Sequence, residues 1–203
     1  MLLRSTRLAI RTWTLYDDEL ADEWPPYNDP FEPLWNLPRQ VGLGGEAWSF
    51  FEGIASRRTW AVEDRHGRLI GRISLREIDT HKVHSRLGIT FGAPYIGQGL
   101  GTEALAVFLD YYFTDLGFET MLLDVAAPNE RAVRSYERLN FSFVGGDWRV
   151  ADSRFDRRVL DTPRYAHLRR FFRQGQNGLY VEFYEMRLDK QDWLGHRQRI
   201  RTR

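Results

Sequence analysis

Three glycines alternate at Gly97, Gly99 and Gly101, where a predicted strand ends and a predicted helix begins. Glycine lets the backbone bend tightly and approach a ligand closely, and N–H groups at the start of a helix attract anions. The loop therefore suits a phosphate-bearing ligand, although an ordinary glycine-rich turn explains the same spacing. A dinucleotide-binding loop would need another glycine at Thr102, and a P-loop would need Lys followed by Ser or Thr, so neither of these loops is present.

The spacing of apolar residues places elements on both sides of this loop. Residues 102–116 carry leucine and aromatic side chains at helical spacing, with Gly117 at the expected exit. Residues 120–125 form an apolar run typical of a strand. Asn129 and Asn140 suit the N-cap and the left-handed exit of a following helix. A strand, the loop, a helix, a strand and a second helix therefore succeed one another.

Further alternating segments predict a mixed sheet. The expected strands are 7–13, 59–63, 69–78, 83–91, 120–125, 141–144 and 178–188. Three of them follow one another through short turns, which predicts an antiparallel meander whose last strand leads into the glycine loop. Another helix is expected between Arg39 and Phe51. These elements predict an α/β (α+β) fold with a central sheet of about six to seven strands.

Composition limits the class of protein. With 203 residues, of which 42% are hydrophobic, the chain can bury one substantial core, so residues 1–203 are expected to form one domain. A formal net charge of +1 gives no indication of nucleic-acid binding. The absence of cysteine excludes disulfides, thiolate metal sites and an acyl-cysteine intermediate. The five histidines show no ligand spacing, so no metal is expected.

No signal peptide or membrane span is expected from the distribution of apolar residues. The opening residues contain no apolar run of the kind found in signal peptides, and no segment reaches the roughly 18 to 20 apolar residues of a membrane span. We therefore expect a soluble, cytoplasmic protein that does not bind a membrane.

An acidic, aromatic segment follows the first strand. Residues 17–32 contain seven Asp or Glu and no Lys or Arg, with Trp24, Tyr27 and Phe31 among them and three prolines that predict a broken helix or irregular loop. Charge runs are usually solvated. The alternative is a wall that binds a cationic acceptor, because carboxylates and aromatic faces together suit an ammonium group.

The C-terminal third is basic. Residues 147–177 hold eight arginines and four aspartates, after a short strand that Gly145 and Gly146 are expected to end. The aromatics of this insertion could stack nucleic-acid bases, or pack the insertion onto the domain or onto a second subunit of a homodimer. The basic tail, residues 190–203, is expected to fray.

Three motifs in this order resemble the GCN5-related N-acetyltransferase (GNAT) family, and within it the RimJ/RimL-like branch. They are Gly97-Gln98-Gly99-Leu100-Gly101-Thr102-Glu103-Ala104-Leu105, Ala126-Ala127-Pro128-Asn129-Glu130-Arg131-Ala132 and Ser135-Tyr136-Glu137-Arg138-Leu139-Asn140-Phe141. The resemblance spans about residues 5–146 and the last strand. It implies a sheet splayed at the coenzyme site, with helices on both faces, and it offers no counterpart for the insertion.

The resemblance implies acetyl-coenzyme A as the donor. Backbone N–H groups at the start of a helix can hold its pyrophosphate without a metal. The family usually begins this loop with Arg or Gln, whereas this chain has Ile96, so side-chain help is lost unless Gln98 supplies it. The residues expected to contact the coenzyme are Thr90, Phe91, Ile96, Gly97, Gln98, Gly99, Leu100, Gly101, Thr102, Asn129, Arg131 and Tyr136.

The resemblance also implies the chemistry. Periodicity alone favours Tyr136 as a core residue, whereas the family's tyrosine at this place is thought to protonate the departing thiolate, a task that suits a phenol. Asp124 stands where some family members carry a general base, and it is otherwise a hydrogen-bonding or edge residue. Glu77 is the other carboxylate considered for the base. Asn129 can both cap its helix and contact pantetheine.

The leading hypothesis is therefore direct acetyl transfer to a primary amine in a ternary complex. The acceptor would be a protein N-terminus or a small cationic amine. The alternative is a non-catalytic module that binds coenzyme A or RNA through the arginine-rich insertion.

Overall fold

The computed structural model describes residues 1–39 and 57–201. The helix expected from about Arg39 to Phe51 lies almost wholly outside these residues. The strands are β1 (Leu2–Arg4), β2 (Leu8–Thr12), β3 (Arg58–Asp64), β4 (Leu69–Asp79), β5 (His84–Phe91), β6 (Thr120–Ala126), β7 (Ser142–Val150), β8 (Phe172–Gly175) and β9 (Gly178–Asp189). The helices are α1 (Leu15–Asp22), α3 (Leu100–Thr114), α4 (Glu130–Arg138) and α5 (Lys190–Arg201), with short 3-10 turns at η1 (Glu32–Leu34), η2 (Ala93–Tyr95), η3 (Arg157–Asp161) and η4 (Ala166–Phe171).

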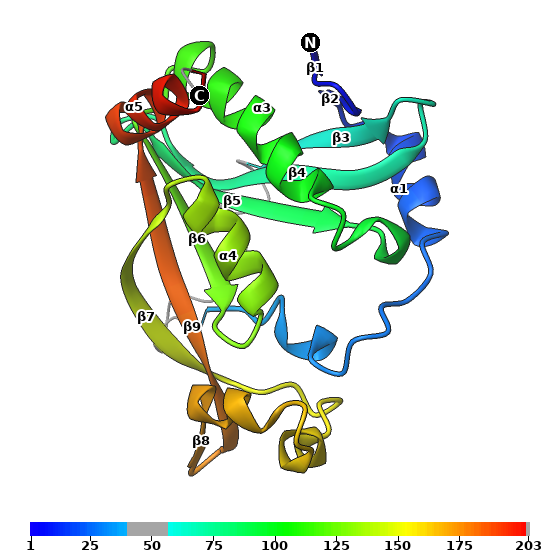
Figure 1. Cartoon of the computed structure of the whole chain (residues 1–203), viewed down its shortest axis with the longest axis vertical. Coiled ribbons are helices and arrows are strands. Elements are labelled where there is room, and N and C mark those ends of the chain that lie inside the picture. The colour runs from blue at the N-terminus through cyan, green and yellow to red at the C-terminus, as the bar shows by residue number, and fades with distance from the viewer. Residues whose placement is uncertain (40–56, 202–203) are drawn as a thin grey trace.

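The described strands form one mixed sheet in the order β1-β2-β3-β4-β5-β6-β9-β7, with β8 paired to β9. Strands β3, β4 and β5 are the predicted antiparallel meander, and β5 with β6 is a parallel pair. The prediction of an α/β fold built on a mixed sheet is confirmed (Figure 1). The nine described strands exceed the expected six to seven because β1 and β8 are too short to show an alternating pattern.

Strands β5 and β6 separate along their length. They pair only over His84–Arg86 and Thr120–Leu122, although β5 continues to Phe91 and β6 to Ala126. Figure 1 shows the two strands diverging toward the glycine loop and the start of α4. The splayed sheet is therefore present, and it leaves backbone groups on both strands free of each other.

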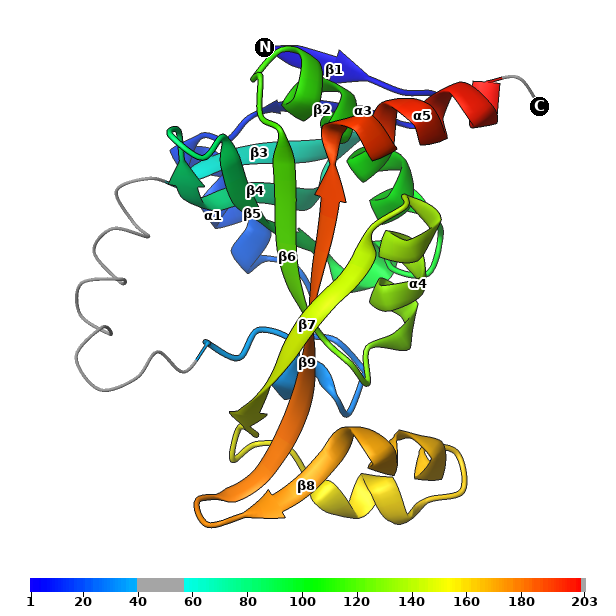
Figure 2. The same ribbon diagram turned by 90° about the vertical axis from the view of Figure 1, so that its left-hand side faces the viewer.

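Helices cover both faces of the sheet. Helices α3, α4 and α5 lie on one side of it and α1 lies on the other (Figure 2). Helix α3 begins at Leu100, two residues before the predicted start, and its apolar face buries Phe108, Leu109 and Tyr112 completely. Burial of such side chains stabilises a fold by about 1.5–3 kcal/mol each, so α3 fixes the position of the loop that precedes it.

The strand predicted at 141–144 is longer in the structure than expected. Strand β7 runs from Ser142 to Val150 and pairs with β9 along its length. The register of this pairing shifts between Phe143 and Gly145. A side chain at Gly146 would lie 2.5 Å from the Phe183 carbonyl oxygen, so this glycine allows close strand pairing and does not end the strand.

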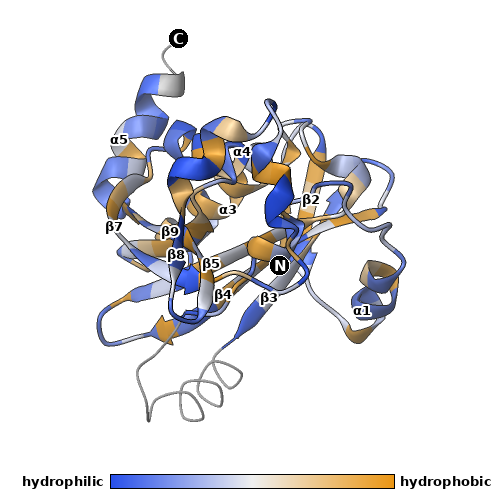
Figure 3. Cartoon of the chain, turned by 90° about the horizontal axis from the view of Figure 1, so that it is seen from below, coloured by the Kyte–Doolittle hydropathy of each residue, from blue (hydrophilic) through white to orange (hydrophobic). Residues whose placement is uncertain are grey.

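The prediction of a frayed tail was wrong for residues 190–201, which form α5. Trp193 is 2% exposed, and its indole N–H donates to Asp110 of α3 at 3.0 Å. Arg197 pairs with the same carboxylate, and Lys190 pairs with Glu119 at 2.9 Å. Helix α5 is mostly hydrophilic in Figure 3, which is why its sequence predicts no docked helix.

The arginine-rich insertion forms a lobe at one end of the molecule, beside β8 and the start of β9 (Figure 2). Phe155, Leu160 and Phe171 are buried there, in a hydrophobic cluster that also includes Phe31 and Phe183. The aromatics of the insertion therefore pack it onto the domain. In the described residues, no helix has the length and apolar character that crossing a membrane requires.

Asp17 is the first residue of the acidic segment and is fully buried. Its carboxylate accepts hydrogen bonds from Arg11 at 2.6 and 2.7 Å and from the Thr14 backbone at 2.7 Å. The Arg11 hydrogen bonds outweigh burial and lower the pKa of Asp17 to about 2. This member of the acidic segment therefore serves as part of the helix cap of α1.

We expect Asp17→Asn to lower the free energy of unfolding by about 2 kcal/mol at neutral pH. Because the folded-state pKa is depressed, this contribution is complete above the unfolded pKa and is lost as pH falls from about 4 to about 2. Urea unfolding at a series of pH values measures it. Asp18→Asn, which alters an exposed neighbour, is the matched control. An equal loss in both variants, or a loss for Asp17→Asn that does not shrink in acid, would contradict this account.

Candidate functional site

A cleft of about 840 Å³ lies where β5 and β6 separate. The glycine loop, the start of α3, one face of β4 and the inner side of α4 line it. The predicted site residues that line it are Thr90, Phe91, Ile96, Gly97, Gly99, Leu100, Gly101, Thr102, Asp124, Asn129, Arg131 and Tyr136. Gln98 and Glu77 do not line it. Most of the predicted positions thus converge although they are far apart in sequence.

The glycine loop adopts backbone conformations that favour glycine. Gly97 and Gly99 have φ of +78° and +77°, in the left-handed region, and Gly99 is the N-cap residue of α3. The first N–H groups of α3 have no partner within the helix and carry its positive dipole end. The loop is therefore built to offer several N–H groups to an anion in the cleft.

Side chains that do not line the cleft hold this loop in place. The Gln98 amide donates to the Pro94 carbonyl at 2.7 Å, so it stabilises the loop and does not replace the missing side chain at Ile96. Arg7 donates to the Gln98 carbonyl at 3.1 Å and pairs with Glu103 of α3 at 2.6 Å. Sequence reasoning assigned no role to Arg7, because an arginine in a first strand carries no signal that it contacts a distant loop.

Tyr136 lies on α4 and faces the cleft. Its side chain is 8% exposed, and its ring packs edge-on against Phe141 with centroids 5.8 Å apart. Burial raises the pKa of Tyr136 to about 12, and the nearby Arg76 opposes this shift. The phenol is therefore protonated at neutral pH and can donate its proton to a group in the cleft.

Two aromatic residues, Tyr27 of the acidic segment and Trp35 beyond it, line one wall of the cleft. The Tyr27 hydroxyl donates to the Phe91 carbonyl at the end of β5. Tyr27 packs edge-on against Trp35, with ring centroids 5.2 Å apart, and the Arg131 guanidinium lies 5.5 Å from the Trp35 ring. Asn129 caps α4 by accepting from the Ala132 N–H at 3.3 Å. Asn129 thus fills the predicted capping role.

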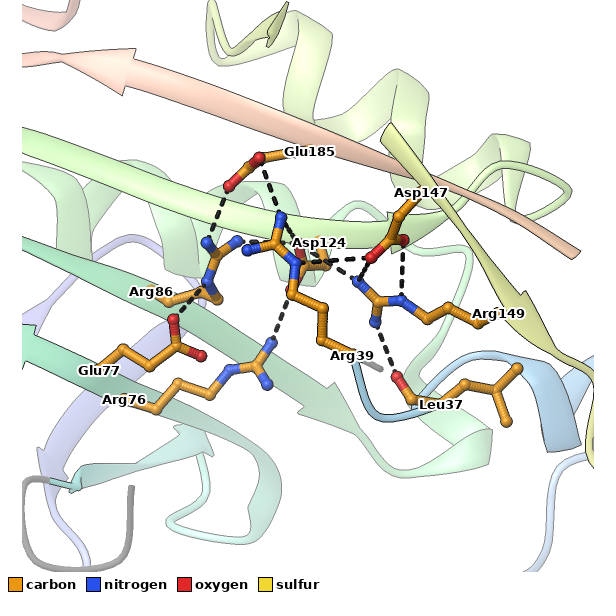
Figure 4. A network of polar contacts seen from close by, with 9 residues as sticks. All are labelled: Leu37, Arg39, Arg76, Glu77, Arg86, Asp124, Asp147, Arg149 and Glu185. Atoms are coloured by element: carbon orange, nitrogen blue, oxygen red, sulfur yellow. Dashed lines mark hydrogen bonds and ion pairs between the residues drawn. The ribbon is translucent and has the colours of Figure 1, made fainter. Parts of the chain in front are cut away.

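Asp124 lies in a network of charged side chains (Figure 4). Its carboxylate accepts from Arg86 at 2.8 Å, and Arg76 and Arg149 each lie 3.5 Å from it. Arg39 lies 3.8 Å away. The side chain of Asp124 is 5% exposed. Burying a carboxylate is costly unless it is paired, so these guanidinium groups are what allow Asp124 to lie there.

Other carboxylates complete the network. Arg86 donates to Glu185 at 2.8 Å and to Glu77 at 2.9 Å. Burial alone would lower the pKa of Arg86, but the surrounding carboxylates outweigh burial and raise it. Arg149 donates to Asp147 and to the Leu37 carbonyl, and lies 3.9 Å from the Phe183 ring centroid. Arg149, counted with the insertion in the sequence, thus belongs to β7, and its guanidinium group lies 3.5 Å from Asp124 of β6.

Glu77 is placed differently from Asp124. It sits at an irregularity of β4 with φ of +49°, its side chain is 55% exposed, and it contacts Arg86 from outside the cleft. Sequence reasoning missed Arg86, Glu185 and Arg149 as neighbours of Asp124. Each is a polar position in a strand, and only the strand order β5-β6-β9-β7 brings them together.

We expect Asp124→Asn to lower the free energy of unfolding by about 3 kcal/mol, because removing one partner of a buried ion pair leaves the other charges uncompensated. Glu77→Gln is the matched control, since an exposed pair contributes at most about 1 kcal/mol. Urea denaturation of both variants against the wild type measures the difference. Equal stability of the two variants would show that the network does not depend on Asp124.

No group of three or more His, Asp or Glu side chains is placed to hold a metal ion in residues 1–39 and 57–201. The anion-binding capacity of the cleft comes instead from backbone N–H groups and arginines. The glycine loop that opens α3 and the protonated Tyr136 thus lie in one cleft at the gap of the splayed sheet. This is the arrangement that the resemblance to the GNAT family implies.

Residues 7–142 match the acetyltransferase (GNAT) domain family, and the chain belongs to that family. The predicted family is thereby confirmed. The match covers the meander, the glycine loop, α3, β6 and α4, and it ends where β7 begins.

Spermidine N(1)-acetyltransferases are among the similar curated proteins. The protein from Escherichia coli strain K12 is 34% identical over 90 residues, which are 44% of this chain and 48% of that protein. The protein from Vibrio cholerae is 33% identical over 86 residues, which are 42% of this chain and 50% of that protein. The chain thus spans about half of the length of the curated relatives it matches.

Solved structures of spermidine N-acetyltransferase from Vibrio cholerae share the fold. The complex with CoA and spermine has a TM-score of 0.63 at 19% identity, covering 94% of this chain and 99% of that chain. A dodecameric structure has a TM-score of 0.59 at 21% identity, covering 94% and 98%. These similarities include the C-terminal strands and therefore extend beyond the matched family region.

Proposed function

We propose that the protein transfers the acetyl group of acetyl-coenzyme A to a primary amine by direct attack in a ternary complex. The observation that carries the proposal is the cleft, which joins the N–H groups at the start of α3 to the Tyr136 phenol across the gap between β5 and β6. Family membership and the similarity to spermidine N-acetyltransferases support it.

The proposed steps conserve protons and charge. The neutral amine attacks the thioester carbonyl, the carbon–sulfur bond breaks, and the Tyr136 phenol donates a proton toward the departing thiolate. The amine's own proton must leave to a base. Of the two predicted carboxylates, Asp124 lines the cleft and Glu77 does not. We propose that Asp124, which lines the cleft, takes this proton through water. Solvent then returns a proton to the Tyr136 phenolate and removes the one on Asp124, which completes the cycle.

The acceptor is a primary amine, and two classes were predicted from the sequence. The similarity to spermidine N-acetyltransferases favours a small amine over a protein N-terminus, and with it a branch other than the RimJ/RimL type. The acidic segment gives little support to a polyamine wall. Tyr27 is its sole contribution to the described cleft lining, and Asp17 is buried in the cap of α1.

The alternative, an RNA-associated module, finds no specific support. Phe155 and Phe171 of the insertion are buried and cannot stack on bases. Arg154 pairs with Asp152, and Arg158 pairs with Asp156. These pairs reduce the positive charge that the insertion offers to phosphates.

A screen of thiol release from acetyl-coenzyme A tests the proposed function. The purified protein is mixed with acetyl-coenzyme A and with spermidine, amino acids, peptides or aminoglycosides in turn. Release that depends on a primary amine is expected, with release in the absence of amine as the background. Tight coenzyme binding without amine-dependent release from any acceptor would contradict the proposal.

A further inference from the structure

One face of β4 presents polar side chains to the cleft. Arg72, Ser74 and Arg76 alternate along the strand and all line the cleft. Ile73 and Leu75 between them are fully buried in the core. Because successive side chains of a strand point to opposite faces, the two arginines lie on the face away from α3, where α1 also lies (Figure 2).

The described lining of the cleft is strongly positive. Its arginines are Arg57, Arg72, Arg76, Arg131, Arg134, Arg138 and Arg149, and Asp124 is the one acidic residue among the described lining residues. Coenzyme A carries several phosphate charges, and the arginines of α4 line the same cleft as the loop that would hold them. The arginines of β4 lie on the opposite side of the gap between β5 and β6, so the coenzyme phosphates do not account for them.

The two arginines of β4 are incompletely paired within the described residues. Arg76 lies 3.5 Å from Asp124, a carboxylate it shares with Arg39, Arg86 and Arg149, and the Arg76 Nε is buried without a hydrogen-bond partner. Burial lowers the pKa of Arg76, and Asp124 only partly offsets this effect. Arg72 lies 5.6 Å from the Trp13 ring. Buried donors in proteins normally have partners, and the Arg76 side chain is 36% exposed. Arg76 therefore has capacity for an anion in the cleft.

We propose that the acceptor carries a carboxylate in addition to its primary amine, and that Arg76 binds this carboxylate in the cleft. The proposal rests on the function proposed above and narrows its acceptor class. Arginine is suited to the role because its planar group can donate two parallel hydrogen bonds to a carboxylate. Arg72 adds positive charge on the same strand face, and this charge opposes acceptors that carry a second ammonium group.

The position of Arg76 also fits the reaction. Arg76 is close enough to Tyr136 for its positive charge to lower the pKa of the phenol, against the effect of burial. A carboxylate held by Arg76 would therefore place the rest of a short acceptor beside the group that protonates the thiolate. Binding energy from this remote carboxylate would orient the amine for attack. This acceptor class differs from spermidine, the polyamine in the names of the similar curated proteins.

Matched acceptors test the inference. The probes are ω-amino acids of graded chain length, the corresponding ω-amino amides and the corresponding diamines, with spermidine included. We expect the kcat/KM of the best amino acid to exceed that of its amide by about 10- to 100-fold, which is the contribution of a charge-assisted hydrogen-bond pair. The diamine of the same length should be poorer than the amide.

Variants identify the residue responsible. Arg76→Gln should bring the ratio of the kcat/KM for the amino acid to that for the amide close to one. The ratio is the readout, because a general loss of turnover lowers both values alike. Arg72→Gln, which lies outside the charge network of Asp124, should improve the diamine relative to the amide. Arg65→Gln, in the turn between β3 and β4, is the control and should leave all ratios unchanged. A coenzyme titration confirms that each variant is folded.

Three results would overturn the inference. The first is a wild type that acetylates diamines or spermidine as well as the matched amino acids or better. The second is an amino acid preference that persists in Arg76→Gln. The third is a protein that acetylates no primary amine at all, and that result alone would also remove the proposed function.

Discussion

Tyr136→Phe is expected to lower kcat by about 100-fold or more, while the Kd for coenzyme A stays within a few-fold of the wild type, because general acid catalysis typically contributes 10²- to 10⁴-fold. Phenylalanine keeps the ring that packs against Phe141 and removes only the hydroxyl. Steady-state kinetics with a saturating amine and a coenzyme titration measure the two quantities.

Tyr111→Phe is the matched control for this prediction. Tyr111 lies on α3, packs against Trp60 and does not line the cleft, so its variant should keep wild-type turnover. The dependence of kcat on pH gives a second check. Because the pKa of Tyr136 is raised to about 12, its phenol keeps its proton at every pH well below that value. Ionisation of this phenol should therefore cause no fall in kcat in that range. Unchanged kcat in Tyr136→Phe would remove the phenol from the mechanism.

Gly99→Val is expected to weaken coenzyme A binding by about 100-fold or more. Gly99 has φ of +77°, and a β-branched residue would be forced out of this left-handed conformation. The N–H groups at the start of α3 would then point away from the pyrophosphate. Each lost hydrogen bond to a charged group costs about 1.5–3 kcal/mol, so loss of two accounts for the expected effect. Isothermal titration with coenzyme A measures it.

Gly67→Val separates this effect from backbone strain. Gly67 also has φ of +77°, but it lies in the turn between β3 and β4, away from the cleft. Both variants should lose about 1–2 kcal/mol of stability from the left-handed residue. Only Gly99→Val should lose coenzyme affinity. Comparable affinity in the two variants would mean that the pyrophosphate binds elsewhere.

The sequence was most informative where short-range patterns determine the structure. The glycine loop before α3, Asn129 as a helix cap and Asn140 in a left-handed exit were all predicted, because each effect involves only neighbouring residues. The apolar spacing of α3 likewise predicted its buried face. These elements position the loop and Tyr136, so most of the predicted cleft lining followed from local signals and from the resemblance to the family.

Long-range contacts were not predictable in the same way. Arg86, Arg149 and Glu185 surround Asp124 only because β6 pairs with β9, which in turn pairs with β7. The positions of Gly146 and Trp193 were misjudged for a related reason. Gly146 allows a close approach to the Phe183 carbonyl, and Trp193 anchors a hydrophilic helix to Asp110. Neither partner is near in sequence.

Mass spectrometry of the acceptor tests the central claim most directly. The protein is incubated with isotopically labelled acetyl-coenzyme A and a panel of primary amines, and both the amines and the protein are analysed. We predict one labelled acetyl group on the nitrogen of an acceptor, no acetyl group held covalently by the protein, and little product with Tyr136→Phe. A protein that binds coenzyme A yet labels no amine in the panel would contradict the account.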